Sequence, residues 1–353
     1  MVAATCRFMN TEEKIGQLFI VGFEGTELSE SIAKLIKQEK IGGVILFPRN
    51  FKDIPQLIRL INNLQTCSLE YQDVPLFVSV DQEGGRVLRL GPPFTQFPSC
   101  AVLGDSNDEN QTKAYAESLA RELKACGINM NCAPVLDILT NKENKVIGDR
   151  AFGSDPETVA CHGSIVIKEF LNQNLIPVGK HFPGHGATST DSHFDLPEVD
   201  MDVEHLKTVE TMPFQQAIQK GLEIIMTAHV KYHNMDPLFP ATLSKTILTS
   251  FLKEELGFQG LVITDDLDMK AVERFYSEEE IPILAVLAGV DCLLVCHSHD
   301  KQQTFIKGLK TAVKKGAIPE ERILESFDKI INLKKKFLEP YQKANDRVAL
   351  KIF

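Results

Sequence analysis

The sequence predicts an α/β protein built as a single (β/α)8 TIM-type barrel, with a long loop after strand 5 and an extra C-terminal helix. Short apolar runs alternate with longer segments of helical period along the chain, which is the pattern of a parallel sheet. Eight such pairs are present, and a chain of 353 residues exceeds the roughly 250 that a minimal barrel needs. No Pro-, Ser- or Gly-rich linker separates a second globular unit, so we treat residues 1–353 as one catalytic domain.

The eight predicted strands are short apolar runs, taken here in chain order. They cover 18–23, 43–47, 76–80, 129–133, 176–180, 223–228, 261–264 and 292–296. Helical segments follow them near 29–39, 53–66, 110–126, 156–173, 203–220, 244–256, 268–288 and 300–315. Ser154, Asp155 and Pro156 have the residue types that open a helix, and Ser244 has the same role for the sixth helix. Most surplus residues lie in the loop 181–202 and in a last amphipathic helix at about 319–336.

Composition and charge restrict the class of protein. With 43% apolar and 24% charged residues the chain is typical of soluble globular proteins. Its net charge of −10, without a block of basic residues, disfavours a nucleic-acid binder. The first ten residues do not resemble a secretory signal, and the longest apolar run, 281–290, is too short to span a membrane. We therefore expect a cytoplasmic protein, acting as a monomer on a small molecule, with no nucleic-acid or membrane partner.

The eight cysteines lie at irregular spacings, which fits reduced thiols better than a disulfide framework. A cluster of Cys292, Cys296, His297 and His299 contains metal-ligand residue types. Its two cysteines are the first and last residues of a predicted buried strand, so we favour a structural role. We expect no metal and no cofactor.

Polar residues directly after the strands are the candidates for function, because the active site of such a barrel lies at the C-terminal ends of its strands. Charged side chains at that mouth commonly hold the hydroxyls of a sugar. Lys180 and His181 end a strand that is predicted to be buried. A buried lysine without a partner is costly, so a ligand hydroxyl or a carboxylate should lie beside Lys180. Further charged residues of this kind are Asp81, Arg89 and Arg150.

Asp265 is an isolated carboxylate at the end of the apolar seventh strand, where it could serve as nucleophile, base or metal ligand. The alternative is a helix N-cap, since Thr264, Asp265 and Asp266 precede a helical segment. We favour a catalytic role for Asp265 and a capping or orienting role for Asp266.

His193 follows Asp191 by two residues, a spacing that lets the carboxylate accept a hydrogen bond from the imidazole. A nearby carboxylate raises the pKa of histidine. With an ordinary pKa near 6.5, only about a quarter of a histidine is protonated at pH 7, so Asp191 would make His193 a usable acid. The alternative is a loop histidine beside an aspartate that forms an ordinary turn.

Five segments together resemble the bacterial β-N-acetylhexosaminidases of glycoside hydrolase family 3. They are DQEGGRVLRL (81–90), GDRAFGSDP (148–156), KHFPGHG with DSHFDLP (180–197), MTAHV (226–230) and ITDDLDMKA (263–271). The resemblance extends over essentially the whole chain. It implies that Asp265 is the nucleophile, His193 the acid/base and Asp191 its partner. It also implies that the N-acetylglucosamine ring is held by Asp81, Arg89, Arg150, Lys180 and His181.

The chain departs from the family pattern at two positions. Ala187 follows the GHG motif where the family often has aspartate, and Asp268 stands where a small polar residue is common. The many family members that cleave β-glucosides take their acid/base from a second domain, which we do not expect in this chain. The Asp-x-His segment of the long loop would replace it.

The resemblance implies a retaining exo-β-N-acetylglucosaminidase that forms a covalent glycosyl-aspartate and acts on cell-wall muropeptides in peptidoglycan recycling. A phosphorylase is the first alternative, because a neutral histidine repels an anionic acceptor less than a carboxylate does. A metal-dependent amidohydrolase is the second, since His181, His185, His193 and Asp265 also follow strands, but the usual His-x-His after the first strand is missing. A sugar-binding barrel without activity is the third, and the presence of both Asp265 and His193 argues against it.

Overall fold

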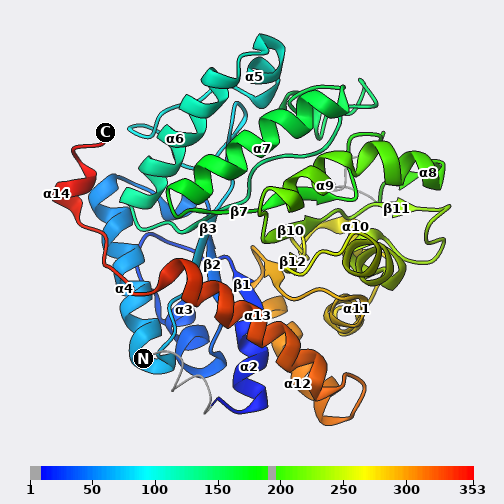
Figure 1. The fold of residues 1–353 in the computed structure, drawn as a ribbon. Coiled ribbons are helices and arrows are strands. Elements are labelled where there is room, and N and C mark those ends of the chain that lie inside the picture. Colours follow the sequence, from blue (N-terminus) through cyan, green and yellow to red (C-terminus); the bar gives the residue numbers. More distant parts are fainter. Residues whose placement is uncertain (1–8, 190–195) are drawn as a thin grey trace.

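The computed structural model describes residues 9–189 and 196–353 and has an α/β fold. Figure 1 shows helices arranged around a central set of strands. Among the described residues, no helix has the length and apolar character needed to cross a membrane.

The central strands form two parallel sheets. The first has six strands in the order β13 (Leu293–Val295), β1 (Phe19–Val21), β2 (Gly43–Leu46), β3 (Phe77–Val80), β6 (Met130–Asn131) and β7 (Ile176–Pro177). The second has the order β12 (Leu261–Ile263), β10 (Ile224–Thr227) and β8 (Gly179–Phe182). Single parallel bridges, Val135 to Lys180 and Ile263 to Cys292, join the two sheets. Each predicted strand segment contains one of these strands, and β7 and β8 together make up the fifth.

The predicted helices are largely confirmed. They are α3 (Glu30–Lys34) with η2 (Leu35–Glu39), α4 (Ile54–Gln72), α6 (Glu109–Ala125), α7 (Pro156–Asn172), α8 (Val203–His205) with η5 (Leu206–Glu210) and α9 (Met212–Gln219), η7 (Thr246–Glu255), α12 (His299–Lys314) and α13 (Glu320–Leu338). The start of α7 shows why the sequence signals worked. The Asp155 side chain accepts a hydrogen bond from the Thr158 N–H, and Pro156 occupies the first turn.

The predicted helix 268–288 is wrong, because two helices occupy this range: α10 (Lys270–Glu273) and α11 (Glu280–Ala288). The Ser277 hydroxyl donates to Glu280 at 2.7 Å, and the Ser277 carbonyl accepts from the Ile281 N–H at 3.1 Å. These local bonds start a new helix, since serine competes with helical hydrogen bonding.

Several short elements were not predicted from the sequence. The helices are α2 (Thr11–Gln17), α5 (Cys100–Ser106), α14 (Asp346–Ala349) and the 3-10 turns η3 (Pro48–Asn50), η4 (Gly148–Arg150) and η6 (Ala241–Leu243). The strands are the antiparallel pair β4 (Gln82–Gly84) and β5 (Val87–Leu88) and the parallel pair β9 (Glu198–Val199) and β11 (Lys231–Tyr232). The start of α2 carries a readable signal, a capping box between Asn10 and Glu13.

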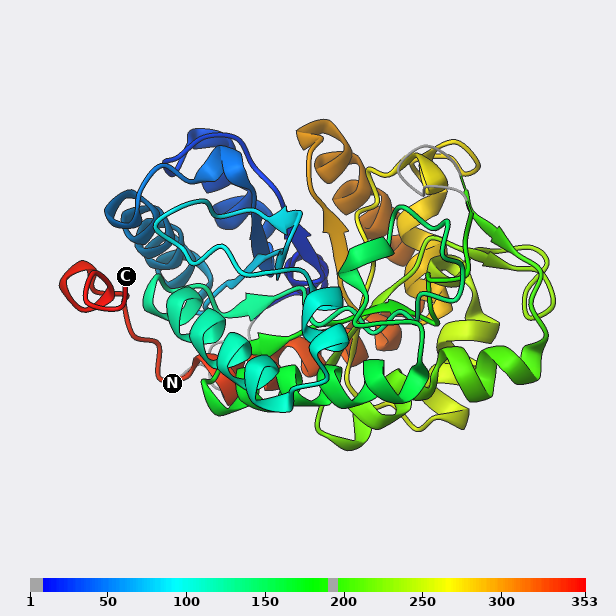
Figure 2. The ribbon, with the colours of Figure 1, turned by 90° about the horizontal axis from the view of Figure 1, so that it is seen from above.

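The terminal helix α13 covers the N-terminal end of the strands (Figure 2). Its Lys334 is fully buried, donates to the Gln17 side chain at 2.9 Å and lies over the ring of Phe77, the first residue of β3. Its Arg322 and Ser326 bind the buried Asp291 carboxylate at 3.1 and 2.7 Å. With α13 packed here, the opposite end of the strands is left for a site.

Candidate active site

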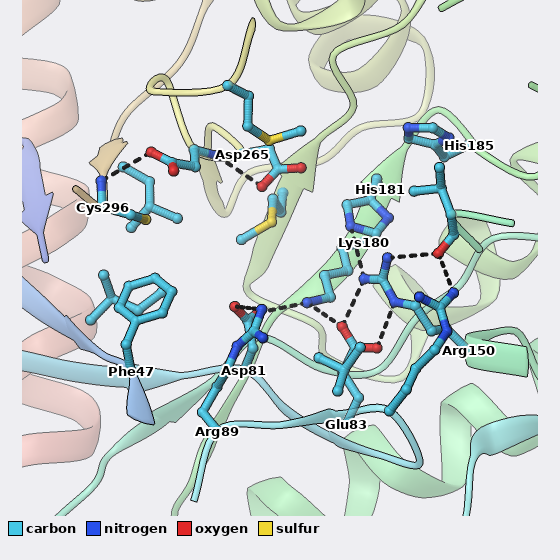
Figure 3. A pocket seen from close by; sticks show the side chains of 18 of the residues that line it. Phe47, Asp81, Glu83, Arg89, Arg150, Lys180, His181, His185, Asp265 and Cys296 are labelled. Atoms are coloured by element: carbon cyan, nitrogen blue, oxygen red, sulfur yellow. Dashed lines mark hydrogen bonds and ion pairs between the residues drawn. The ribbon is translucent and has the colours of Figure 1, made fainter. Parts of the chain in front are cut away.

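A pocket of about 330 Å³ lies at the C-terminal ends of the strands. Four of its lining residues come just after strands: Phe47 after β2, Asp81 after β3, Asp265 after β12 and Cys296 after β13. Figure 3 shows these side chains around one cavity. The pocket therefore occupies the place predicted for a barrel active site. Six of the predicted site residues line it: Asp81, Arg89, Arg150, Lys180, His181 and Asp265.

Lys180 lies between two carboxylates on one side of the pocket. Its Nζ is 2.8 Å from Asp81 and 2.6 Å from Glu83. Arg89 approaches the same Asp81 at 3.7 Å. Burial alone would lower the pKa of Lys180, but Asp81 and Glu83 outweigh burial and hold the pKa above its usual range. The carboxylate partner expected for this buried lysine is present, and Lys180 carries a positive charge at neutral pH.

Glu83 is a site residue that sequence reasoning missed. Its two carboxylate oxygens accept from the Nε and Nη2 of Arg150 at 2.8 Å each, a bidentate pair. Burial would raise the pKa of Glu83, but Arg150 and Lys180 hold it below its usual range. Glu83 therefore binds two of the predicted sugar-holding cations at once (Figure 3). Its position inside the DQEGGRV segment was the available signal.

The turn after Glu83 requires glycine. Gly84 has a φ of +110°, and a Cβ there would lie 2.3 Å from the Pro98 carbonyl oxygen. After this turn, Arg86 donates to Asp149 at 2.7 Å and to the Val146 carbonyl at 2.6 Å. The segment thus fastens the loop that carries Arg150.

His181 is held by a second buried carboxylate that was not predicted as a site residue, Asp137. His181 donates to Asp137 through Nδ1 at 2.7 Å, and its Nε2 lies 3.5 Å from an Arg150 nitrogen. The hydrogen bond to Asp137 thus fixes the orientation of the imidazole ring. Asp137 also accepts from the backbone N–H of His181 and of His185 at 3.1 and 2.7 Å. Burial would raise the pKa of Asp137, but His181 lowers it.

Asp265 presents its carboxylate to the pocket (Figure 3). The Asp266 N–H donates to one of its oxygens at 2.8 Å. Burial would raise the pKa of Asp265, but His181 and His229 outweigh burial and lower it to about 2. Asp265 is therefore ionised at neutral pH, as a carboxylate nucleophile must be.

Asp266 has a different environment although it follows Asp265 directly. Its Oδ1 accepts from the N–H groups of Asp268 and Cys296 at 3.1 and 3.0 Å. Burial and the nearby Asp268 raise the pKa of Asp266 to about 7. Its backbone N–H orients Asp265, in keeping with the orienting role that the sequence favoured.

Two predicted residues, Asp191 and His193, lie outside the described residues. The candidate metal cluster does not converge: Cys292 and Cys296 are buried, while His299 pairs with Gln303 at 3.1 Å. Within 9–189 and 196–353, no group of three or more His, Cys, Asp and Glu side chains could hold a metal ion.

The chain matches known sequences over most of its length. The model of the "Glycosyl hydrolase family 3 N terminal domain" matches residues 10–333. A beta-hexosaminidase from Thioalkalivibrio sulfidiphilus is 38% identical over 296 residues, which are 82% of this chain and 83% of that protein. Beta-hexosaminidase A from Pseudoalteromonas piscicida is 33% identical over 88% of this chain. The match spans only 56% of that longer relative.

Solved structures give the same result. The glycoside hydrolase family 3 beta-N-acetylglucosaminidase from Paenibacillus sp. str. FPU-7 superposes with a TM-score of 0.92 at 38% identity, covering 98% of this chain and 67% of that one. The beta-N-acetylhexosaminidase from Beutenbergia cavernae gives a TM-score of 0.87 at 28% identity, with 92% and 98% covered. The sequence matches and the fold therefore agree with one family.

Proposed function

The chain belongs to glycosyl hydrolase family 3, and from this membership we propose that it is a retaining exo-β-N-acetylglucosaminidase, a glycoside hydrolase that releases terminal β-linked N-acetylglucosamine. The observation that carries the proposal is the ionised Asp265 in a pocket lined by five other predicted sugar-binding residues. The two beta-hexosaminidase relatives and the two structural neighbours support it.

In the proposed mechanism, an Asp265 oxygen attacks the anomeric carbon and forms a covalent glycosyl-aspartate. His193 protonates the leaving glycosidic oxygen and then removes a proton from the water that resolves the intermediate. The low pKa of Asp265 supports the role of nucleophile. The roles of His193 and its partner Asp191 rest on the sequence resemblance.

The geometry of the pocket supports binding of one sugar ring. Asp81, Lys180, Arg150, Arg89 and His181 converge on its polar side and offer both donors and acceptors for hydroxyl groups. The lining also includes the apolar side chains of Ile45, Met226 and Leu294. Residues after strands of both sheets surround the cavity, so a terminal sugar fits it better than the middle of a polysaccharide chain. This supports exo action.

The finer parts of the proposal follow from the resemblance. We propose that the two sheets close into one (β/α)8 barrel that forms a single catalytic domain. The substrates we propose are cell-wall muropeptides, cleaved in the cytoplasm during peptidoglycan recycling. The described cysteines are all free, which supports a reducing compartment.

Turnover of an aryl N-acetyl-β-glucosaminide tests the proposal. The wild-type chain should release the aryl alcohol and N-acetylglucosamine. NMR of the first-formed sugar should show the β-configuration, that is, retention. The Asp265→Ala variant should lose this activity. Adding phosphate separates the phosphorylase alternative: phosphate-dependent release of N-acetylglucosamine 1-phosphate would overturn hydrolysis. If the Asp265→Ala variant kept the wild-type turnover, the assignment of Asp265 as the nucleophile would be wrong.

A further inference from the structure

One wall of the pocket has no role in the proposed mechanism. It consists of Phe47 and Arg49 after β2 together with Asp266 and His297 after β12 and β13. Three of these side chains line the pocket, and His297 is exposed over about half of its surface, 55%. A ligand in the pocket can therefore reach the imidazole.

Arg49 determines which nitrogen of His297 carries the proton. The Nη1 of Arg49 lies 3.3 Å from the Nδ1 of His297. Arginine has no acceptor, so Nδ1 accepts and the neutral ring carries its proton on Nε2. Arg49 is itself fixed, because it donates to the carbonyls of Phe23 and Cys296 at 2.9 and 2.6 Å. The arrangement leaves His297 as a donor on its free side.

The Nε2 atom of His297 faces the Asp266 carboxylate. Nε2 lies 3.6 Å from the Oδ2 of Asp266, which is too far for a direct hydrogen bond. A hydroxyl oxygen about 2.8 Å from both atoms fits this separation, accepting from His297 and donating to Asp266. A donor and an acceptor at this spacing therefore suit one hydroxyl group.

Asp268 fixes the backbone beneath this pair. Its Oδ2 accepts from the N–H groups of His297 and Ser298 at 2.7 and 3.0 Å, and its Oδ1 lies 3.5 Å from Lys301. Asp268 is one of the two positions at which the sequence differs from the expected family pattern. The aspartate thus acts as a positioning residue for His297.

Phe47 adds a flat apolar surface beside the pair. Its ring centroid lies 5.1 Å from that of His297, and the Arg49 guanidinium lies over it at 4.4 Å. The C–H groups of a sugar ring pack on such a surface while a hydroxyl at the ring edge reaches the polar pair. The wall therefore combines stacking with directional hydrogen bonding.

We propose that His297 and Asp266 form a binding site for one hydroxyl group of the terminal sugar, with Phe47 packing against the same sugar. This proposal rests on the proposed function, because it takes the sugar in the pocket to be N-acetylglucosamine. It makes His297 a specificity-determining residue on the wall opposite to Lys180 and His181.

The site can be tested by measuring enzyme variants against substrates that each lack one hydroxyl group. The substrates are 4-nitrophenyl N-acetyl-β-glucosaminide and its 3-, 4- and 6-deoxy analogues. His297→Ala should lower kcat/KM for the parent about five- to tenfold, the effect of one neutral hydrogen bond. For the deoxy analogue that lacks the bound hydroxyl, His297→Ala should cause no further loss of kcat/KM. Asp266→Asn should likewise lower kcat/KM for the parent but not for this same analogue. His297→Gln, which retains an N–H donor, should recover part of the parent activity.

His299→Ala is the matched control, since this histidine pairs with Gln303 in α12 and does not line the pocket. It should leave kcat/KM unchanged for all four substrates. If His297→Ala lowers kcat/KM equally for all four substrates, or does not lower it at all, the hydroxyl site is wrong. Wild-type turnover would still support the proposed function in that case. If the wild type cleaves none of the four, the proposed function fails and the hydroxyl site with it.

Discussion

The Oε1 oxygen of Glu83 lies 2.6 Å from the Nζ of Lys180, and both side chains are almost completely buried beside the pocket. The same carboxylate holds Arg150 in a bidentate pair. A buried charge is stabilised only by its partners, so the two cations and Glu83 depend on one another. Glu83 is thus a positioning residue for two groups proposed to hold the sugar.

Glu83→Gln should raise KM for the aryl N-acetyl-β-glucosaminide and reduce kcat/KM by about tenfold or more, because Lys180 and Arg150 lose a shared charged partner. The substitution should also lower the pKa of Lys180, since one of its two carboxylates is removed. Steady-state kinetics measure the changes in KM and kcat/KM, and NMR titration of the Lys180 ammonium group measures the change in its pKa.

The control for this substitution is Glu122→Gln. Glu122 is a buried carboxylate that accepts from the Thr95 N–H at 2.9 Å and does not line the pocket. Its replacement should reduce stability while kcat/KM and the pKa of Lys180 stay the same. If Glu83→Gln behaved like Glu122→Gln, the positioning role would be wrong.

The attachment of α13 gives a stability prediction. Asp291 is fully buried and lies 3.1 to 3.6 Å from Arg322, Lys253 and Lys329. Burial would raise its pKa, but these cations lower it. Asp291→Asn should reduce the free energy of unfolding by about 3–5 kcal/mol at pH 7, because it removes the buried negative charge that faces three partly buried cations.

The pH dependence of this effect has a defined sign. A carboxylate with a depressed folded-state pKa stabilises above its unfolded pKa of about 3.9 and loses that contribution as pH falls through the folded-state pKa. Urea unfolding of wild type and Asp291→Asn should therefore show a difference that is constant from pH 5 to pH 7 and shrinks in acid. A constant difference down to about pH 2 would contradict the ion-pair explanation.

The strands and most helices were predictable from the sequence because local patterns determine them. Apolar runs such as Gly43–Leu46 are buried along their whole length, and the Asp155–Pro156 pair is a local helix start. The break between α10 and α11 was missed, although four polar residues, 277–280, interrupt the apolar spacing at the Ser277–Glu280 contact that starts a new helix. Periodicity does not report such a competing hydrogen bond.

For the site, the sequence indicated residues at or just after the ends of predicted strands, such as Lys180 and Asp81. It did not indicate their partners, because those contacts join distant segments: Glu83 and Arg150 are 67 positions apart, and Asp137 and His181 are 44 apart. The tautomer of His297 likewise depends on Arg49, 248 positions away. Spacing within a motif carries no information about such pairs.

Asp266 gives a stability prediction whose pH dependence is opposite to that of Asp291. Its pKa is raised to about 7, so the folded state favours the protonated form. Such a group stabilises the fold fully below its unfolded pKa of about 3.9, and this stability is lost as pH rises towards 7. Asp266→Asn cannot ionise, so its stability relative to wild type should increase from pH 4 to pH 7, by an amount on the order of 2 kcal/mol. Thermal unfolding at several pH values measures this, and a pH-independent difference would contradict the raised pKa.

The proposed acid/base pair gives the last prediction. A carboxylate partner raises the pKa of a histidine, so Asp191→Ala should lower the pKa of His193. His193 must be protonated to act as the acid, and the alkaline limb of kcat/KM should therefore move to lower pH while the rate at pH 7 falls. Asp200→Ala is the control, because Asp200 is exposed and accepts from Asn234 at 2.8 Å. The control should retain the wild-type profile. An Asp191→Ala variant with unchanged rate and unchanged pH profile would show that the two residues do not act as a pair.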